Sequence, residues 1–325
     1  MPAPRASPAP RASLARLAGA LAYHQVMLAD ARRNRAFRRA LVARVRPGTS
    51  VLDLGAGTGV WAVTAARLGA RRVVAVEREA VLVPVIEALA REAGVSDRVE
   101  VVRADARRVR LRREFDLVVG ELVGNAAFEE GLVPLFERAR RHFLRPGGTL
   151  VPEWVSLVAA PVVAPSRLGL SPPFLPSASV AALTGHIPRN LHPSELRPLA
   201  PGRELLRLDL HSARAGDLLP TARVSFHVRD GRAVGGIAVW VVMGLAPGVR
   251  LATRAGTHWL PTLLPLDPQP HGPGRLEVEI DWNGARRRWS TRFSGANGRS
   301  QAAHHSPLFA WGSVRAGLRG HSRRH

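Results

Sequence analysis

The sequence predicts an α/β domain with a parallel sheet, followed by an antiparallel β domain. In the first half of the chain, short apolar runs alternate with stretches of helical periodicity. A proline-rich segment at 165–201 interrupts this pattern, and short β-type runs follow it. A chain of 325 residues with 46% hydrophobic residues is long enough to bury the cores of two ordinary domains.

The elements of the first half follow one another in a regular order. Residues 25–44 carry apolar positions at helical spacing and predict a helix. Strands are expected at 51–54, 73–76, 99–103, 115–119 and 149–151, and helices at 59–68, 80–93 and 127–143. Strands that alternate with helices of this length indicate right-handed crossovers and a parallel sheet covered on both faces.

The second half has the pattern of an antiparallel sandwich or barrel. Its β-type runs lie at 205–210, 221–228, 236–242, 275–282 and 288–293. Turn pairs such as Asp230-Gly231 and Asn283-Gly284 separate some of these runs. The expected division is a disordered tail at 1–21, the α/β domain at 22–152, the β domain at 153–295 with the insertion at 165–201, and a basic disordered tail at 296–325.

Composition excludes some kinds of chemistry. The chain has no cysteine, which excludes disulfides, thiolate-bound metals and thiol nucleophiles, and no metal site is expected. Its 47 basic residues are all arginine, and the formal net charge is +22. Such a charge suits a nucleic-acid or acidic partner, but an excess of Arg, Ala, Gly, Pro and Val is also typical of compositional bias.

Targeting signals are weak. The uncharged run at 236–249 is shorter than the roughly 20 apolar residues that a membrane-spanning helix needs, so no membrane partner is expected. The first 16 residues are rich in Ala, Pro and Arg, but no apolar signal core follows them. A cytoplasmic location is therefore the expectation.

The segment 51–61 predicts a strand, a glycine-rich turn and the start of a helix. The strand carries Asp53 near its end, and Gly55, Gly57 and Gly59 follow it. Glycines are needed where the backbone turns sharply and a ligand approaches without a side chain between them. The N-terminus of the next helix then offers free N–H groups to a negatively charged ligand.

Two further acidic residues end neighbouring strands. Glu77 lies 22 residues after Gly55, where a carboxylate can accept hydrogen bonds from both hydroxyls of a ribose. Asp105 follows the third strand, where a carboxylate can accept the amino group of an adenine. The loop spacing is GxGxG, not the GxGxxG of NAD sites, and no GxxxxGK[ST] triphosphate loop is present. Together with Asp53, this arrangement resembles class I S-adenosylmethionine-dependent methyltransferases and implies that cofactor.

The fourth strand is followed by an acidic loop. Glu121 stands at the carboxyl end of the strand and Glu130 nine residues later. Ligands of open α/β sheets bind outside the carboxyl ends of the strands, so Glu121 is expected beside the transferred methyl group. Two buried carboxylates need a cationic partner, and a guanidinium with five donors in a rigid fork suits such a pair.

These motifs are similar to those of the protein arginine methyltransferase family. Glu121, Gly124 and Glu130 match its double-glutamate pattern E-x-x-G-x5-E. Its helix pattern H-x-x-M-L-x-D-x-x-R and its Thr-His-Trp loop are matched by His24, Met27, Leu28, Asp30, Arg33, Thr257, His258 and Trp259. The resemblance covers about residues 22–295 and implies a Rossmann-like class I methyltransferase domain followed by a β-barrel.

The resemblance also implies roles for single residues. His24 and Arg33 would bind the cofactor, Arg33 through the cofactor carboxylate. Glu121 and Glu130 would clamp the substrate guanidinium, and His258 would pair with Asp30 across the domains. A homodimer is implied as well, with residues 165–201 in the place of the family's dimerisation arm.

Three functions stay open. The first is transfer of a methyl group from S-adenosylmethionine to an arginine guanidino nitrogen of a protein substrate. The second is methylation of a small amine or guanidino compound. The third is a catalytically dead methyltransferase fold that binds nucleic acid, although nucleic acid is not expected as the main partner, because a dead site would not need Asp53, Glu77 and Asp105.

Overall fold

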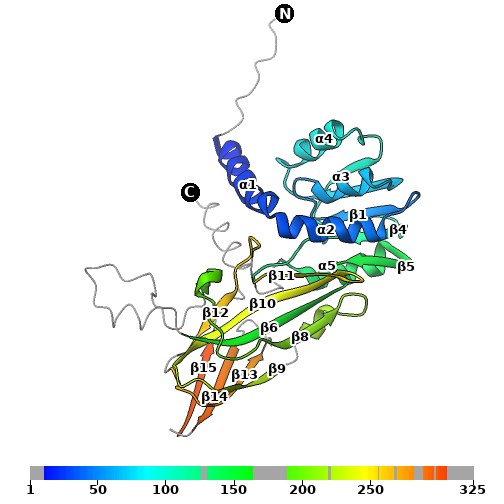
Figure 1. The fold of residues 1–325 in the computed structure, drawn as a ribbon. Coiled ribbons are helices and arrows are strands. Elements are labelled where there is room, and N and C mark those ends of the chain that lie inside the picture. Colours follow the sequence, from blue (N-terminus) through cyan, green and yellow to red (C-terminus); the bar gives the residue numbers. More distant parts are fainter. Residues whose placement is uncertain are drawn as a thin grey trace, which may run out of the picture. The chain divides into compact units, whose positions relative to one another are not determined.

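The computed structural model describes residues 11–125, 130–163, 189–218, 221–254, 256–266, 269–281, 288–295 and 298–305. The chain divides into two compact units (Figure 1). Unit 1 comprises Met1–Glu121 with Arg141–Val151, and unit 2 comprises Leu122–Arg140 with Pro152–His325. Most of the predicted proline-rich insertion at 165–201 and the predicted turn at 283–284 lie outside the described residues.

Unit 1 contains the predicted parallel sheet. Its elements are α1 (Arg11–Ala29), α2 (Ala31–Arg44), β1 (Ser50–Leu54), α3 (Val60–Arg67), β2 (Arg72–Glu77), α4 (Val83–Glu92), β3 (Val99–Arg103), β4 (Phe115–Val119) and β5 (Leu144–Val151). Within the described residues these strands pair in the order β3-β2-β1-β4-β5, all in parallel. The order reverses between β1 and β4, and the carboxyl ends beside such a switch point are where open α/β sheets bind ligands.

The burial of β1 explains why its sequence is an almost continuous apolar run. All five of its residues are buried, as expected for the central strand of a parallel sheet. Leu52 of β1 pairs with Val74 of β2 on one side and with Val118 of β4 on the other. The adjacent α3 buries Trp61, whose ring stacks on Phe37 of α2 with 4.9 Å between the ring centres.

Two predictions for the start of the chain are wrong. The predicted helix at 25–44 is two helices, because the backbone leaves helical geometry at Asp30 (φ −73°, ψ 86°) and a new helix begins there. The predicted disordered tail at 1–21 is helical from Arg11 onward. The four prolines of that segment all precede Arg11, and the Ala, Leu and Arg residues that follow them favour a helix.

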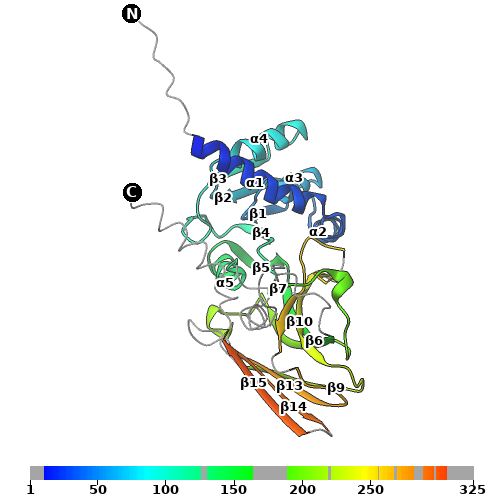
Figure 2. The same ribbon diagram turned by 90° about the vertical axis from the view of Figure 1, so that its left-hand side faces the viewer.

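Unit 2 is antiparallel. Its elements are α5 (Leu132–His142, whose last two residues belong to unit 1), β6 (Trp154–Val163), β7 (Arg189–Asn190), η1 (Pro193–Glu195), β8 (Arg203–Asp209), η2 (Ala215–Leu218), β9 (Ala222–Val228), β10 (Val234–Ala246), β11 (Val249–Ala252), β12 (Thr262–Pro265), β13 (Gly274–Asp281), β14 (Arg288–Gly295) and β15 (Gly298–His305). In the described part of the chain one sheet has the order β7-β12-β10-β6-β8 with β11 on β10, and the other has the order β15-β14-β13-β9. Figure 2 shows the strands of the second sheet side by side.

The two sheets bury apolar side chains in the period of two that strands dictate. In β13, Leu276, Val278 and Ile280 are buried, and Glu277 and Glu279 between them are more exposed. The long strand β10 has almost every residue buried, and it pairs with β6 along ten positions. The sequence predicts an antiparallel β domain here, and the sheet pairings confirm it.

The end of the β domain differs from its predicted boundary. Residues 298–305, predicted to be part of a disordered tail, form β15 and pair with β14 in antiparallel register. The segment GRSQAAHH has no alternating apolar pattern, so its strand comes from backbone pairing along the edge of the sheet. The remaining residues of both predicted tails lie outside the described ranges.

Candidate active site

The predicted glycine loop lies between β1 and α3. Gly55, Gly57 and Gly59 have φ values of 70°, 58° and 80°, a region that strains other residues. A Cβ atom on Gly57 would lie 2.6 Å from Cε1 of His24. Glycine is therefore required at Gly57 both by its conformation and by the close approach of α1.

Glu77, at the end of β2, is buried and fastens the glycine loop. One carboxylate oxygen accepts the N–H of Gly57 at 2.8 Å, and the other accepts the N–H of Glu79 at 2.8 Å. A carboxylate has about four lone-pair directions, so two acceptor positions remain for a ligand hydroxyl. The place of Glu77 beside the loop is compatible with the ribose contact expected from the sequence.

Asp53 is buried below the glycine loop, with 1% of its surface exposed. Its Oδ2 accepts the N–H of Ala62 in the first turn of α3 at 2.9 Å, and Oδ1 has no hydrogen-bond partner. Burial raises the pKa of Asp53 to about 7, and the Ala62 N–H partly offsets this rise. In this structure Asp53 positions the start of α3.

Asp105 lies beyond the end of β3 and is more accessible than the other two acids. Arg107 clamps its carboxylate, with Nε 3.0 Å from Oδ1 and Nη2 2.6 Å from Oδ2. This guanidinium lowers the pKa of Asp105 to about 2. An adenine amino group at Asp105 would share the carboxylate with Arg107.

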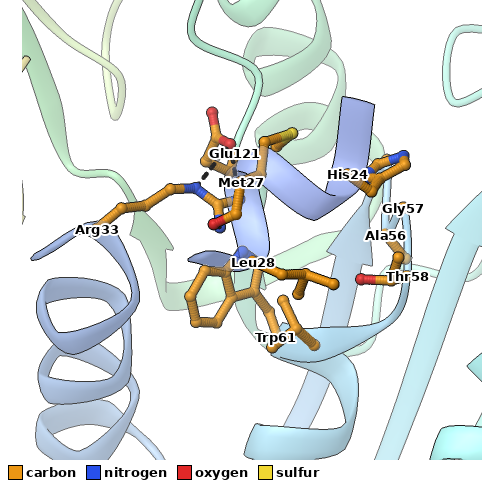
Figure 3. Close-up of a pocket in the computed structure, with 11 residues that line it drawn as sticks. His24, Met27, Leu28, Arg33, Ala56, Gly57, Thr58, Trp61 and Glu121 are labelled. Atoms are coloured by element: carbon orange, nitrogen blue, oxygen red, sulfur yellow. Dashed lines mark hydrogen bonds and ion pairs between the residues drawn. The ribbon is translucent and has the colours of Figure 1, made fainter. Parts of the chain in front are cut away.

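A small pocket opens beside the glycine loop (Figure 3). It joins side chains of α1 and α2 to the loop and to the end of β4. The lining residues are His24, Met27, Leu28, Arg33, Gly55, Ala56, Gly57, Thr58, Val60, Trp61 and Glu121. Burial lowers the pKa of His24, against a smaller rise caused by Glu77, so its imidazole is neutral near pH 7.

Arg33 and Glu121 form a buried ion pair in this pocket. Nη2 and Nε of Arg33 lie 2.7 Å and 3.0 Å from the same oxygen of Glu121, and the two side chains are 3% and 5% exposed. Figure 3 shows the guanidinium turned toward that carboxylate. Glu121, predicted to bind a substrate guanidinium, therefore holds a guanidinium of its own chain.

The start of α2 sets the position of Arg33. Asp30 is the N-cap of this helix, and its Oδ1 accepts the backbone N–H of Arg33 at 2.8 Å. The guanidinium lies over the ring of Trp61, with 5.0 Å between its carbon and the ring centre, and Nη1 donates to Asn34 at 2.9 Å. The helix break at Asp30 thus directs Arg33 into the pocket.

In unit 2, the Thr-His-Trp loop is joined to the segment that follows Glu121. The indole N–H of Trp259 donates to the carbonyl oxygen of Val123 at 2.7 Å, and Trp259 is buried. Asn125 accepts the N–H of Leu260 at 3.2 Å. The ring of His258 packs on Trp259, with 4.0 Å between the ring centres. These contacts explain why residues 122–140 group with the β domain, although the sequence analysis placed them in the α/β domain.

Two predicted pairings remain predictions. Glu130 is exposed, in the turn before α5, and belongs to unit 2, whereas Glu121 belongs to unit 1. Asp30 and His258 likewise belong to different units. The predicted clamp of two glutamates and the predicted His258–Asp30 pair therefore enter the proposal below.

Three side chains matter here that the sequence analysis did not assign. Trp61 lies under the Arg33 guanidinium, Asn125 binds the Thr-His-Trp loop, and Arg107 occupies Asp105. Asn125 directly follows the glycine of the double-glutamate pattern, which is a usable signal. Trp61 and Arg107 had no such signal, because apolar helix residues and arginines are frequent in this chain.

Comparison with known proteins gives the family. The profile described as "Methyltransferase domain" matches residues 51–148. An "Arginine N(omega)-methyltransferase" of Streptomyces achromogenes subsp. streptozoticus is 30% identical over 277 residues, which are 80% of this chain and 76% of that protein. The chain belongs to the arginine methyltransferase family. "Protein arginine N-methyltransferase 6" of Danio rerio is 32% identical over 141 residues, 43% of this chain and 40% of that protein.

Solved structures of arginine methyltransferases share the fold. The Trypanosoma brucei PRMT1 enzyme-prozyme heterotetrameric complex with AdoHcy has a TM-score of 0.78 at 20% identity, covering 87% of this chain and 97% of that one. Arabidopsis thaliana protein arginine methyltransferase 10 has a TM-score of 0.76 at 17% identity, covering 89% and 99%. The arginine methyltransferase described here thus has the predicted Rossmann-like domain followed by a β-barrel domain.

The cofactor of this arginine methyltransferase is S-adenosylmethionine, and the residues of unit 1 fit it. The glycine loop carries no side chain at Gly55, Gly57 and Gly59, where its φ values are positive, and α3 begins directly after it. Glu77 retains acceptor capacity beside the loop. Among the described residues no group of His, Asp and Glu side chains could hold a metal ion, and no helix there is long and apolar enough to cross a membrane.

Proposed function

We propose that this protein methylates a guanidino nitrogen of arginine residues in a protein substrate. The observation that carries the proposal is the Arg33–Glu121 pair. Glu121 holds a guanidinium through two N–H donors while it is buried in the cofactor pocket. Its surroundings are therefore suited to a planar cation with several donors, which is the chemistry of an arginine acceptor.

Arg33 and Glu121 would change partners during binding. A bound cofactor supplies an electrophilic methyl group on a sulfonium, and it also carries a carboxylate. Arg33 can pair with that carboxylate, and Glu121 then becomes available to the guanidinium of the acceptor. The exchange keeps both buried charges compensated, which matters because an unpaired buried charge is costly.

The glutamates would activate the acceptor. A guanidinium is a poor nucleophile because its positive charge is delocalised over three nitrogens and its pKa exceeds about 12. Carboxylates of Glu121 and Glu130 bound to two of the nitrogens draw the charge toward themselves and leave electron density on the third. The proton of that nitrogen is then accepted by a glutamate or by His258, which Asp30 would orient.

The cofactor would be held by the residues that the sequence analysis named. Glu77 would accept hydrogen bonds from the ribose hydroxyls, and Asp105 would accept one from the adenine amino group. The Gly55–Gly59 loop would lie against the cofactor. His24 approaches Gly57 closely and would contact the same region in its neutral form. Asp53 supports this arrangement from below, through the start of α3.

The competing acceptor is a small guanidino compound. The Streptomyces relative that spans most of this chain is named for arginine, without the word protein. To separate the two, we would supply methyl-labelled S-adenosylmethionine together with an Arg/Gly-rich peptide or with free L-arginine. Methylarginine in the acid hydrolysate of the peptide supports the proposal. Label that appears only in free L-arginine, or no label at all, overturns it. The nucleic-acid alternative predicts steeply salt-dependent DNA binding without cofactor binding.

We also propose a homodimer and a cytoplasmic location. Helix α1 exposes apolar side chains that a partner surface could cover, with exposed fractions of 40%, 47%, 58% and 45% for Leu21, Tyr23, Val26 and Leu28. Light scattering of the wild type and of V26E checks the dimer, since a charge in a covered apolar face should shift the mass toward that of a monomer. Fractionation of expressing cells checks the location.

A further inference from the structure

One face of the sheet β8-β6-β10-β11 carries a tryptophan with arginines on it. Trp154 of β6 is paired in register with Gly244 of β10, and Gly244 is paired with Arg250 of β11. The guanidinium carbon of Arg207, from β8, lies 3.9 Å from the centre of the Trp154 ring. That of Arg250 lies 5.5 Å from the same ring. One indole therefore holds two guanidiniums.

Gly244 makes this arrangement possible. A Cβ atom at this position would lie 2.0 Å from Nε1 of Trp154, so the indole lies where a side chain of β10 would otherwise stand. Any other residue would force the ring to move. The absence of a side chain in β10 thus brings the ring of Trp154 within reach of arginines on both neighbouring strands.

A second tryptophan on the same face has an arginine as well. Trp240 lies four residues before Gly244 in β10, and positions an even number apart in a strand share a face. The guanidinium carbon of Arg254 lies 5.5 Å from the centre of the Trp240 ring. We refer to Trp154, Arg207, Trp240, Arg250 and Arg254 together as the arginine–tryptophan face. Its three arginines are exposed, Trp154 is half-buried, and Trp240 is buried in the core below Arg254.

The arginines of this face have few acidic partners. Within the described ranges, neither Arg250 nor Arg254 has a carboxylate within 4.0 Å. Arg207 has Glu204 at 4.0 Å, and Glu204 also accepts the hydroxyl of Ser156 at 2.8 Å. By contrast, the exposed Arg223 lies 2.7 Å from its own carboxylate partner. The face therefore presents uncompensated positive charge.

The chemistry of the face favours carboxylates over nucleobases. A guanidinium stacked on a ring keeps the N–H donors of its edge free, and these match a planar carboxylate. Nucleic acid that binds as a single strand needs open aromatic faces for its bases, but here guanidiniums lie on the rings.

We propose that the arginine–tryptophan face docks an acidic segment of a partner protein. This docking goes beyond the proposed methyl transfer, because it recognises a negatively charged segment and the catalytic pocket would recognise a cation. It is a binding property of unit 2, and its measurement requires no turnover. Its failure is therefore distinguishable from failure of the proposed function.

Fluorescence anisotropy tests the proposal with a labelled octaglutamate peptide and the full-length protein at low salt. The test variant is R250Q/R254Q. The control variant, R223Q/R232Q, removes the same charge from exposed arginines that have carboxylate partners of their own. The affinity of the test variant should be about tenfold lower, since two exposed charge contacts are lost, and that of the control should stay within about twofold of the wild type.

Each outcome of the anisotropy experiment either supports or overturns the proposed docking surface. A selective loss in the test variant supports the docking surface, as does binding that weakens when salt is raised. Equal losses in both variants show a general effect of net charge and overturn the proposal. Absence of octaglutamate binding overturns it too, as does tighter binding of a labelled oligothymidine of equal charge. Binding of S-adenosylhomocysteine, measured in parallel, confirms that the variants are folded.

Discussion

Replacing Glu121 with glutamine removes the charge that compensates Arg33 inside the pocket. Both side chains are almost fully buried, and both contacts fall on one oxygen of Glu121. Removing one partner of a buried ion pair typically costs 3–5 kcal/mol, and glutamine keeps one acceptor, so E121Q should lower the free energy of unfolding by about 3 kcal/mol. Urea denaturation followed by tryptophan fluorescence measures this change.

The exposed pair of Arg223 and Glu279 is the matched control. Its N···O distance is 2.7 Å, the same as in the buried pair, but its side chains are 75% and 39% exposed. E279Q should therefore cost less than about 0.5 kcal/mol, because an exposed ion pair contributes little. If E121Q and E279Q cost the same, burial is not what makes the Arg33–Glu121 pair important, and our reasoning fails.

Bound cofactor gives a second test of the Arg33–Glu121 pair. If Arg33 exchanges Glu121 for the cofactor carboxylate, saturating S-adenosylhomocysteine should reduce the cost of E121Q. In addition, replacing both partners by apolar residues, R33M/E121L, should cost less than E121Q alone in the absence of cofactor, because no buried charge is left unpaired. A cost of E121Q that cofactor does not change would argue against the exchange.

Three further predictions concern the pocket and the Thr-His-Trp loop. G57A should weaken cofactor binding about tenfold or more in calorimetric titration, since a Cβ there would meet His24, whereas G69A, also at positive φ but with open space, should not. Burial raises the pKa of Asp53 from 3.8 to about 7, so the folded protein binds a proton that the unfolded chain has lost between these values. The free energy of unfolding should therefore fall as pH rises from 4 to 7, and D53N should remove that slope and stabilise the protein at pH 8 by up to about 4 kcal/mol. W259F should cost about 1–2 kcal/mol and lower kcat while the cofactor Kd stays the same, because it removes a buried hydrogen bond; an unchanged kcat would separate this loop from catalysis.

The α/β half of the fold is predictable from sequence because its signals are local. The strand at 115–119 and the strand at 99–103 have the predicted bounds, since each is a short run made mainly of Val, Leu and Phe. The helix break at Asp30 was missed, because an aspartate within a helical pattern does not show whether it caps a new helix. That break matters, since it directs Arg33 into the pocket.

The β half is less predictable because its strands depend on partners far away in the chain. The strand β6 was missed, although its pairing with β10 is the longest in the structure's described part. Its sequence is a nearly continuous apolar run that includes Pro161, so it lacks the alternation typical of a half-buried strand. The strand β15 was missed because its pairing uses the backbone and its side chains are mostly polar.

Sequence also predicts the candidate site only in part, because some of its contacts join residues far apart in the chain. The spacing of Glu77 and the glycines predicts where the cofactor site lies, and the structure has a pocket beside the glycine loop, with Glu77 bound to Gly57. Spacing could not predict that Glu121 would hold Arg33, because the pair joins residues 88 positions apart. Nor could spacing predict that Arg107 would pair with the carboxylate of Asp105, since arginine is so frequent in this chain that its position alone does not indicate a partner.

The central claim is that glutamates activate a protein arginine for methylation. The most direct test is turnover of an Arg/Gly-rich peptide by the wild type and by E130Q, at saturating peptide and S-adenosylmethionine, with methylarginine quantified by mass spectrometry. Glu130 is exposed, so glutamine should leave stability and cofactor affinity unchanged. We expect kcat to fall by about two orders of magnitude, as for loss of a group that acts on the reacting atoms. Full turnover by E130Q would contradict the account.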